Sequence, residues 1–147
     1  MTEPPVAAGQ FDFWVGEWEV LDPTGRVVGH NSITRLCGGR ALSERWSGVG
    51  GVEGASLSSW DTARGRWHQT WMDSTGSTLL LDGGVVDGAM VLEGDSPDDE
   101  DPSRQQAHRI TWTPRDGEVR QLWEVSDDNG STWSVAFDGR YRPASSA

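Results

Sequence analysis

Short turn sequences recur at near-regular intervals along the chain, and their spacing limits the fold more than any other feature. Each contains glycine, which tolerates the positive φ angle needed where a chain reverses. The runs between the turns have the length of strands, often alternate apolar and polar residues, and show no sustained helical period. The turns are Pro23-Thr24-Gly25, Gly38-Gly39, Gly50-Gly51, Ala63-Arg64-Gly65, Ser74-Thr75-Gly76, Asp87-Gly88, Asp116-Gly117 and Asp128-Asn129-Gly130. The sequence therefore predicts an antiparallel β meander.

The runs between these turns define about ten strands. A meander of this many short strands removes its exposed edges most simply by closing into a barrel, and such a barrel is wide enough to hold a small ligand. We therefore expect an all-β fold, a single up-and-down antiparallel β-barrel. The predicted strands lie near residues 14–22, 26–36, 40–48, 54–61, 66–73, 77–83, 85–94, 107–114, 118–126 and 132–142.

The length of 147 residues suits one domain with one core. We place the barrel domain at residues 10–142, between disordered tails at 1–9 and 143–147. Residues 93–106, EGDSPDDEDPSRQQ, combine clustered acids with two prolines, which predicts a solvated, mobile acidic loop between two strands.

Charge and hydropathy exclude several classes of partner. The formal net charge of −11 repels phosphate backbones, so nucleic acid is not an expected partner. The N-terminus has no basic region followed by an apolar run, and the chain has no stretch of about 20 apolar residues, so we expect no membrane association. We predict a cytoplasmic protein and leave its oligomeric state open, a homodimer included.

Cysteine and histidine usage gives no metal or redox motif. Cys37 is the single cysteine, so no internal disulfide forms, and we expect its side chain to be small, apolar and buried. His30, His68 and His108 lie on separate predicted strands without ligand-like spacing. We therefore expect no metal and no cofactor. Haem binding is the minor alternative. It needs a histidine that points into the cavity, and the alternation of its strand places His108 on the inner face.

Nine tryptophans supply the apolar area that this chain lacks in aliphatic residues. Three aromatic residues, Phe13, Trp14 and Trp18, gather in the segment FDFWVGEWEV at the start of the first predicted strand. We expect them to plug one end of the barrel and leave the other end open.

Gly16-Glu17-Trp18 is a GxW motif, and the chain also contains GGRALSERW, RWHQTWMDSTG, RITWTP, RQLWEVSDDNGSTW and FDGRY, in that order. This pattern resembles an uncharacterised bacterial family of lipocalin-like proteins within the calycins. The resemblance covers nearly the whole domain and implies a calycin barrel, in which the GxW tryptophan closes one end and an arginine of the last strand packs across it. Arg140 or Arg142 occupies the corresponding place. No activity follows from the resemblance.

Residues 126–133, SDDNGSTW, fit the Asp-box pattern of sialidases. We interpret this motif as a folding device, in which Asp128 accepts hydrogen bonds from turn amides, Gly130 adopts positive φ and Trp133 packs beneath the hairpin. Sialidase chemistry is not expected, since it needs a much longer propeller with repeated boxes.

The two-residue alternation of strands predicts which side chains face inward. Placing the tryptophans inside brings a few polar groups with them. The predicted inner residues are Leu42, Glu44 and Trp46; Trp67, Gln69, Trp71 and Asp73; His108, Ile110 and Trp112; Gln121, Trp123 and Val125; and Trp133, Val135 and Phe137.

An aromatic interior with sparse polar groups is typical of a small-molecule pocket. We predict that indole rings bind the ligand by stacking while polar groups orient it. The alternative is a filled core with a satisfied polar network. The predicted ligand-binding residues are Trp46, Gln69, Trp71, His108, Trp112, Gln121 and Trp123.

Two carboxylates are candidates for proton transfer. Burial between Leu42 and Trp46 would raise the pKa of Glu44 and suit it to general acid or base chemistry. Two alternatives are neutralisation by Arg45, Arg109 or Arg120, and a register slip that exposes the residue. Asp73 lies at a strand end beside a turn, where a rim or capping role competes with catalysis.

The sequence thus predicts a barrel that binds a hydrophobic or aromatic organic molecule in a tryptophan-lined cavity. The alternative is a cofactor-independent cyclase or isomerase, acting on a polyketide-like or terpenoid substrate, with Glu44 or Asp73 moving a proton. A third alternative, a binding protein for another macromolecule, requires a large exposed apolar patch.

Overall fold

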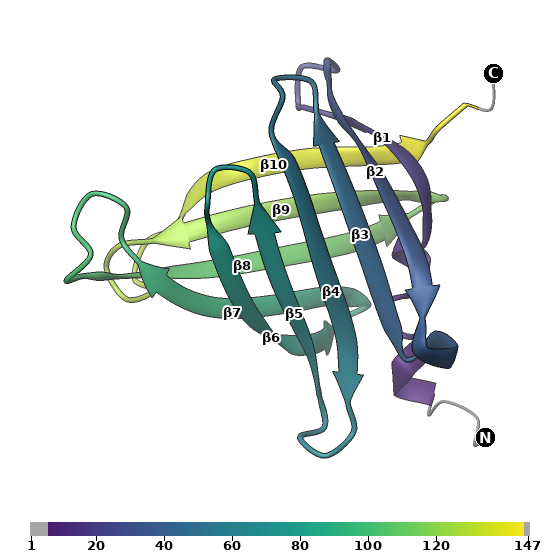
Figure 1. The fold of residues 1–147 in the computed structure, drawn as a ribbon, viewed down its shortest axis with the longest axis horizontal. Coiled ribbons are helices and arrows are strands. Elements are labelled where there is room, and N and C mark those ends of the chain that lie inside the picture. The colour runs from purple at the N-terminus through teal and green to yellow at the C-terminus, as the bar shows by residue number, and fades with distance from the viewer. Residues whose placement is uncertain (1–5, 146–147) are drawn as a thin grey trace.

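The computed structural model describes residues 6–145, which form three short 3₁₀-helices and ten strands (Figure 1). The helices are η1 (Val6–Gly9), η2 (Asp12–Trp14) and η3 (Cys37–Gly39). The strands are β1 (Gly16–Leu21), β2 (Val27–Leu36), β3 (Ala41–Gly48), β4 (Glu53–Asp61), β5 (Arg66–Asp73), β6 (Thr78–Val86), β7 (Ala89–Pro97), β8 (Gln105–Arg115), β9 (Glu118–Ser126) and β10 (Ser134–Pro143).

Each strand pairs antiparallel with the next along the chain, and β1 also pairs with β10. The closing pairs run from Trp18 opposite Pro143 to Leu21 opposite Arg140. The sheet is therefore a closed up-and-down barrel, which confirms the predicted all-β fold. No helix within residues 6–145 is long and apolar enough to cross a membrane.

The Asp-Gly turns explain why the hairpins form where the sequence predicts them. Asp87 and Gly88 have φ angles of 50° and 81°, and Asp116 and Gly117 have 52° and 80°. Two consecutive residues with positive φ make the two-residue turn whose twist matches that of paired strands. These turns join β6 to β7 and β8 to β9.

The acidic loop is shorter than residues 93–106, because β7 continues to Pro97 and β8 begins at Gln105, its pairing partner. The acids organise the turn that remains. The Oδ1 atom of Asp98 accepts a hydrogen bond from the Glu100 amide at 2.8 Å, and that of Asp101 accepts one from the Ser103 amide at 3.1 Å. Side-chain acceptance of turn amides is the usual reason for aspartate in such positions.

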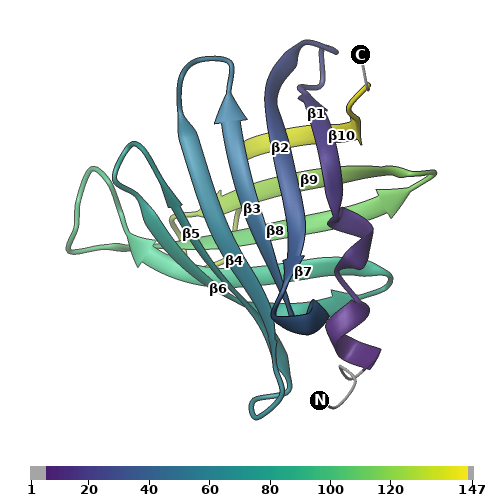
Figure 2. The same ribbon diagram turned by 45° about the vertical axis from the view of Figure 1, so that its right-hand side comes forward.

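The folded N-terminal segment begins earlier than we expected. Val6–Gly9, within the predicted tail, form η1, and Ala8 in this turn is buried. Residues 1–5 of that tail and 146–147 at the other end lie outside the described residues. Figure 2 shows the N-terminal helical turns and η3 gathered at one end of the barrel.

An aromatic plug closes this end of the barrel. Its members are Phe11, Trp14, Trp67 and Trp112, all buried. The rings of Phe11 and Trp14 stack with centroids 4.8 Å apart, and the Trp112 ring meets that of Phe11 at 5.1 Å. Trp18 joins from β1, since its Nε1 donates to the Trp14 carbonyl at 2.7 Å. The aromatic N-terminal segment thus supplies Phe11 and Trp14 to the plug, β5 and β8 supply Trp67 and Trp112, and Phe13 is only partly buried.

The partner of Trp18 on the last strand is not an arginine. The ring of Tyr141 packs against Trp18 with centroids 6.0 Å apart. Arg142 instead forms an ion pair with Glu19, and Arg140 lies 3.6 Å from Glu118.

Two further expectations from the sequence are wrong. Trp133 and Val135 do not face the interior, because the β10 register shifts between Val135 and Phe137 and reverses the alternation there. Val135 is exposed, and Trp133 lies outside the barrel under the guanidinium of Arg109, 4.1 Å away. Cys37 is exposed rather than buried, because β2 ends at Leu36 and the chain turns outward into η3.

The plug yields a test of what holds the closed end together. We expect Trp14→Ala to lower the free energy of unfolding by about 3 to 5 kcal/mol, because it leaves a cavity between Phe11 and Trp112. Urea denaturation measures this change. Val6→Ala, at a side chain that is 95% exposed in the same segment, is the control and should change stability by less than about 0.5 kcal/mol. Equal effects of the two substitutions would contradict this role of the plug.

Candidate functional site

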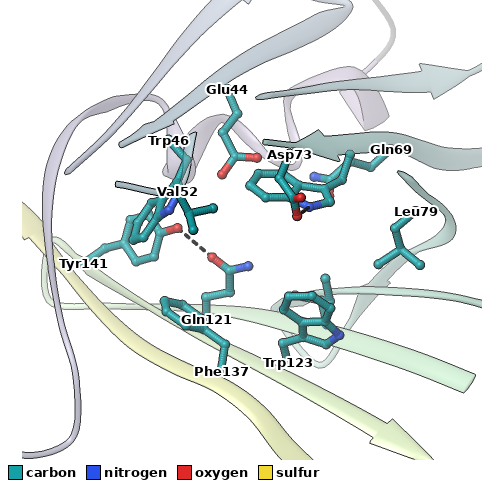
Figure 3. Close-up of a pocket in the computed structure, with 12 residues that line it drawn as sticks. Glu44, Trp46, Val52, Gln69, Asp73, Leu79, Gln121, Trp123, Phe137 and Tyr141 are labelled. Carbon is teal, nitrogen blue, oxygen red and sulfur yellow. Dashed lines mark hydrogen bonds between the residues drawn. The ribbon is translucent and has the colours of Figure 1, made fainter. Parts of the chain in front are cut away.

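A cavity of about 180 Å³ lies inside the barrel, at the end opposite the plug (Figure 3). Seven of the nine predicted catalytic and ligand-binding residues line it: Glu44, Trp46, Gln69, Trp71, Asp73, Gln121 and Trp123. The remaining lining residues are Val52, Leu79, Ile110, Phe137 and Tyr141. The cavity is mainly apolar and aromatic, with a few polar groups that converge on it.

Trp112 and His108, the other two predicted ligand-binding residues, lie elsewhere. Trp112 belongs to the plug. His108 is buried on the inner face of β8, where Nδ1 accepts a hydrogen bond from Trp123 Nε1 at 3.1 Å and Nε2 lies 2.7 Å from Ser96 Oγ. Desolvation lowers the pKa of His108, against weaker opposing effects of Asp95 and Asp99. His108 is therefore neutral at neutral pH and holds the Trp123 ring in place.

A buried polar network spans five strands beside the cavity. It consists of Asn31, Glu44, Ser56, Gln121 and Tyr141. The carboxylate of Glu44 accepts hydrogen bonds from Asn31 Nδ2 and Ser56 Oγ, each at 2.7 Å. Asn31 Nδ2 also donates to Tyr141 Oη at 2.9 Å, and Tyr141 Oη donates to Gln121 Oε1 at 2.6 Å. Asn31, Ser56 and Tyr141 were not among the site residues predicted from the sequence.

Glu44 is buried, 5% exposed, and its pKa is raised. Desolvation is the main cause, and the hydrogen bonds from Ser56 and Asn31 offset part of it. Neither of the two alternatives applies. The strand has not slipped, because Glu44 is buried. Arg45 is exposed, and Arg109 and Arg120 pair with Glu124 and Asp138 instead. Desolvation and then the Glu44 charge also raise the pKa of Tyr141 well above its usual value, so the phenol stays protonated.

Asp73 lies at the end of β5, on the cavity rim. Its Oδ1 accepts a hydrogen bond from the Thr75 amide at 2.9 Å, and its Oδ2 accepts one from Trp71 Nε1 at 3.1 Å. Desolvation acts to raise the pKa of Asp73, but the hydrogen bonds from Thr75 and Trp71 outweigh it and the pKa is lowered. Asp73 is thus an ionised residue that organises the turn and holds the Trp71 ring. This arrangement favours the predicted rim or capping role over catalysis.

Glycines on neighbouring strands create the room for two of the lining rings. A Cβ atom on Gly29 would lie 2.4 Å from Cη2 of Trp46, and one on Gly54 would lie 2.0 Å from Cη2 of Trp71. Both distances are far below van der Waals contact, so each ring occupies space that a side chain at the glycine would fill. The indoles consequently cover the wall and leave the centre of the barrel free.

A second hollow, the outer vestibule, adjoins the cavity and shares Trp71, Leu79 and Trp123 with it. Its outer wall comes from the β5–β6 turn and the acidic loop, including Asp98 and Asp99. Arginine is absent from the described residues that line either space.

The Asp-box segment lies away from the cavity and acts as a folding device. Asp128 Oδ1 accepts hydrogen bonds from the Thr132 amide and Ser126 Oγ, both at 2.8 Å. The hydrogen bonds from Thr132 are the main reason that the pKa of Asp128 is lowered to about 2. Gly130 has a φ of 90°, as the turn requires.

No protein-family model matches this chain, and no curated protein matches its sequence. Within residues 6–145, no group of three or more His, Cys, Asp and Glu side chains is arranged to hold a metal ion.

The buried carboxyl predicts a specific dependence of stability on pH. A carboxyl whose folded pKa exceeds its unfolded value of about 4.5 binds its proton more tightly in the folded state, so stability falls as pH rises from the unfolded toward the folded pKa. Glu44→Gln cannot titrate, and its amide can hydrogen bond to Asn31 and Ser56. We expect the variant to lose this dependence and to be more stable at neutral pH, in urea denaturation between about pH 5 and pH 8. Parallel curves for the two proteins would contradict the burial of an ionisable carboxyl.

The close approach of the Trp71 ring to Gly54 gives a second test. We expect the added methyl group of Gly54→Ala to displace the Trp71 ring and to lower the free energy of unfolding by about 1 to 3 kcal/mol, because the ring and the methyl group would overlap. Gly84→Ala is the matched control in β6, where an added Cβ meets nothing within 4 Å. Denaturation gives the stability, and the indole N–H signal of Trp71 in a ¹H–¹⁵N spectrum reports the ring. An unshifted Trp71 signal in Gly54→Ala would contradict the close approach.

Proposed function

We propose that this protein binds a small aromatic or hydrophobic organic molecule in the cavity of its barrel. The observation that carries the proposal is free space of about 180 Å³ whose walls are three indoles and a phenyl ring and whose inner end is plugged. An engineered cavity of about 150 Å³ with apolar walls in another protein binds benzene, so this cavity suits a ligand of about one ring. As part of the proposal, the chain is related to the lipocalin-like barrels that its motifs resemble.

The arrangement of the walls supports affinity by stacking. Trp71 and Trp123 have their N–H groups committed to Asp73 and His108, which holds both rings in fixed orientations. A rigid aromatic wall loses little conformational freedom when a ligand binds, and offset or edge-to-face ring contacts add about 0.5 to 1.5 kcal/mol each.

Two carboxamides support orientation of the ligand. Gln69 donates to Ser58 Oγ at 3.0 Å, and Gln121 uses its oxygen to accept from Tyr141. The Gln121 amide nitrogen makes no hydrogen bond to the described residues and lies on the cavity wall, as Figure 3 shows. It is thus a donor for a ligand carbonyl, hydroxyl or ring nitrogen.

One observation favours catalysis as the second candidate function. Glu44 combines burial, a raised pKa and a place on the cavity wall, which are the properties of a general acid. A cyclase or isomerase that acts on a polyketide-like or terpenoid substrate would lose turnover in Glu44→Gln while keeping substrate affinity. Asp73 supports this candidate less, because its oxygens already serve the turn and Trp71.

We place the protein in the cytoplasm in this proposal. The exposed thiol of Cys37 is compatible with a reducing compartment, where it stays unpaired.

The binding proposal is tested by titration with 2-phenylethanol, a neutral one-ring probe. We expect the indole N–H signals of Trp71 and Trp123 to move during the titration, and Trp123→Leu to weaken binding about tenfold in calorimetry, the loss of one stacking wall. Trp133→Leu is the control, because Trp133 lies outside the barrel under Arg109. The proposal fails if the probe moves the Trp133 signal instead, or if the two variants bind it equally.

A further inference from the structure

The cavity presents a buried carboxylate that no basic side chain of residues 6–145 neutralises. Desolvation and the hydrogen bonds from Ser56 and Asn31 account for the electrostatic state of Glu44, and no arginine contributes. None of the ion pairs formed within residues 6–145 includes this residue. A buried carboxylate without a partner is costly, and a cation that entered the cavity would remove that cost.

The Glu44 carboxylate retains room for another donor. Each of its oxygens accepts one hydrogen bond from the protein, whereas an ionised carboxylate offers about four acceptor positions. Figure 3 shows the carboxylate directed toward the space bounded by Trp46, Val52 and Gln121. A ligand N–H group can therefore reach it from the cavity without displacing Asn31 or Ser56.

The aromatic walls favour the same kind of ligand. The faces of tryptophan and phenylalanine rings carry negative potential and attract ammonium groups, an interaction that strengthens when water is excluded. Trp46 and Phe137 meet edge to face at 5.9 Å on one side of the cavity, and Trp71 and Trp123 line the same space.

The approach to the cavity is also acidic. Asp73 stands ionised at the rim, Asp98 and Asp99 line the outer vestibule, and His108 is held neutral. With a net charge of −11, the whole molecule attracts cations and repels anions. An anionic ligand would meet a repulsive carboxylate and no arginine among the described lining residues.

We propose that the ligand is a compact aromatic or cyclic amine, bound as a cation with its nitrogen against Glu44 and its ring among the indoles. This inference rests on the proposed function and adds a chemical class to it. It excludes simple organic acids as good ligands of the cavity.

Three probes that share one ring and differ in charge test the proposal: 2-phenylethylamine, 2-phenylethanol and phenylacetate. Calorimetry at neutral pH gives their affinities, and the indole N–H signals of Trp71 and Trp123 verify that each binds in the cavity. We expect the amine to bind about tenfold more tightly than the alcohol, because an ammonium–carboxylate ion pair away from water is stronger than a hydrogen bond from a neutral hydroxyl to the same carboxylate, and phenylacetate to bind most weakly.

Two variants assign the preference to Glu44. Glu44→Gln removes the charge and should therefore bring the amine to about the affinity of the alcohol. Asp116→Asn removes the same charge from a side chain that is 94% exposed in the β8–β9 turn, and should preserve the order of the three probes.

The wild-type affinities alone decide the inference, even if a variant fails to fold. If the alcohol or phenylacetate binds as tightly as the amine, the inference is wrong while the cavity remains a binding site. If none of the three probes gives saturable binding, the proposed function fails as well.

Discussion

The structure depends on an uneven distribution of aromatic rings along the barrel axis. At one end, Phe11, Trp14, Trp67 and Trp112 fill the interior with mutual contacts. At the other end, Trp46 and Trp71 occupy the space beside Gly29 and Gly54 that a Cβ atom would fill. The same residue type thus closes one half and lines the other. Well-packed interiors leave few voids, and the glycines of the open half give Trp46 and Trp71 room beside the barrel wall.

The open half also determines the chemistry of Glu44. In a filled barrel this residue would be an internal polar group, satisfied by Asn31 and Ser56 and closed to any ligand. Beside a cavity, the same desolvation that raises its pKa makes it a strong and directional contact for a molecule that enters. Under the proposed function, the burial that destabilises the ionised form of Glu44 is also what would make it a strong contact for a ligand.

Much of the fold follows from local signals in the sequence. Asp87-Gly88 and Asp116-Gly117 adopt the turn conformation that their residue types favour, and regular alternation places Glu44, Gln69 and Gln121 at the cavity. Prediction fails where the structure departs from local rules. The β10 bulge turns Val135 outward, and nothing in its sequence marks the extra residue. The contact of Asn31 with Tyr141 joins residues 110 apart, so only the closed barrel reveals it.

Binding of a ligand in this barrel requires that the space between the indoles is empty and apolar. A crystal structure of the protein under xenon pressure tests it most directly, since xenon enters dry apolar cavities without needing a specific contact. We expect a xenon atom between Trp71, Trp123 and Phe137, with Trp46 and Trp71 still against Gly29 and Gly54. Rings swung inward to fill that space, with no xenon inside the barrel, would contradict it.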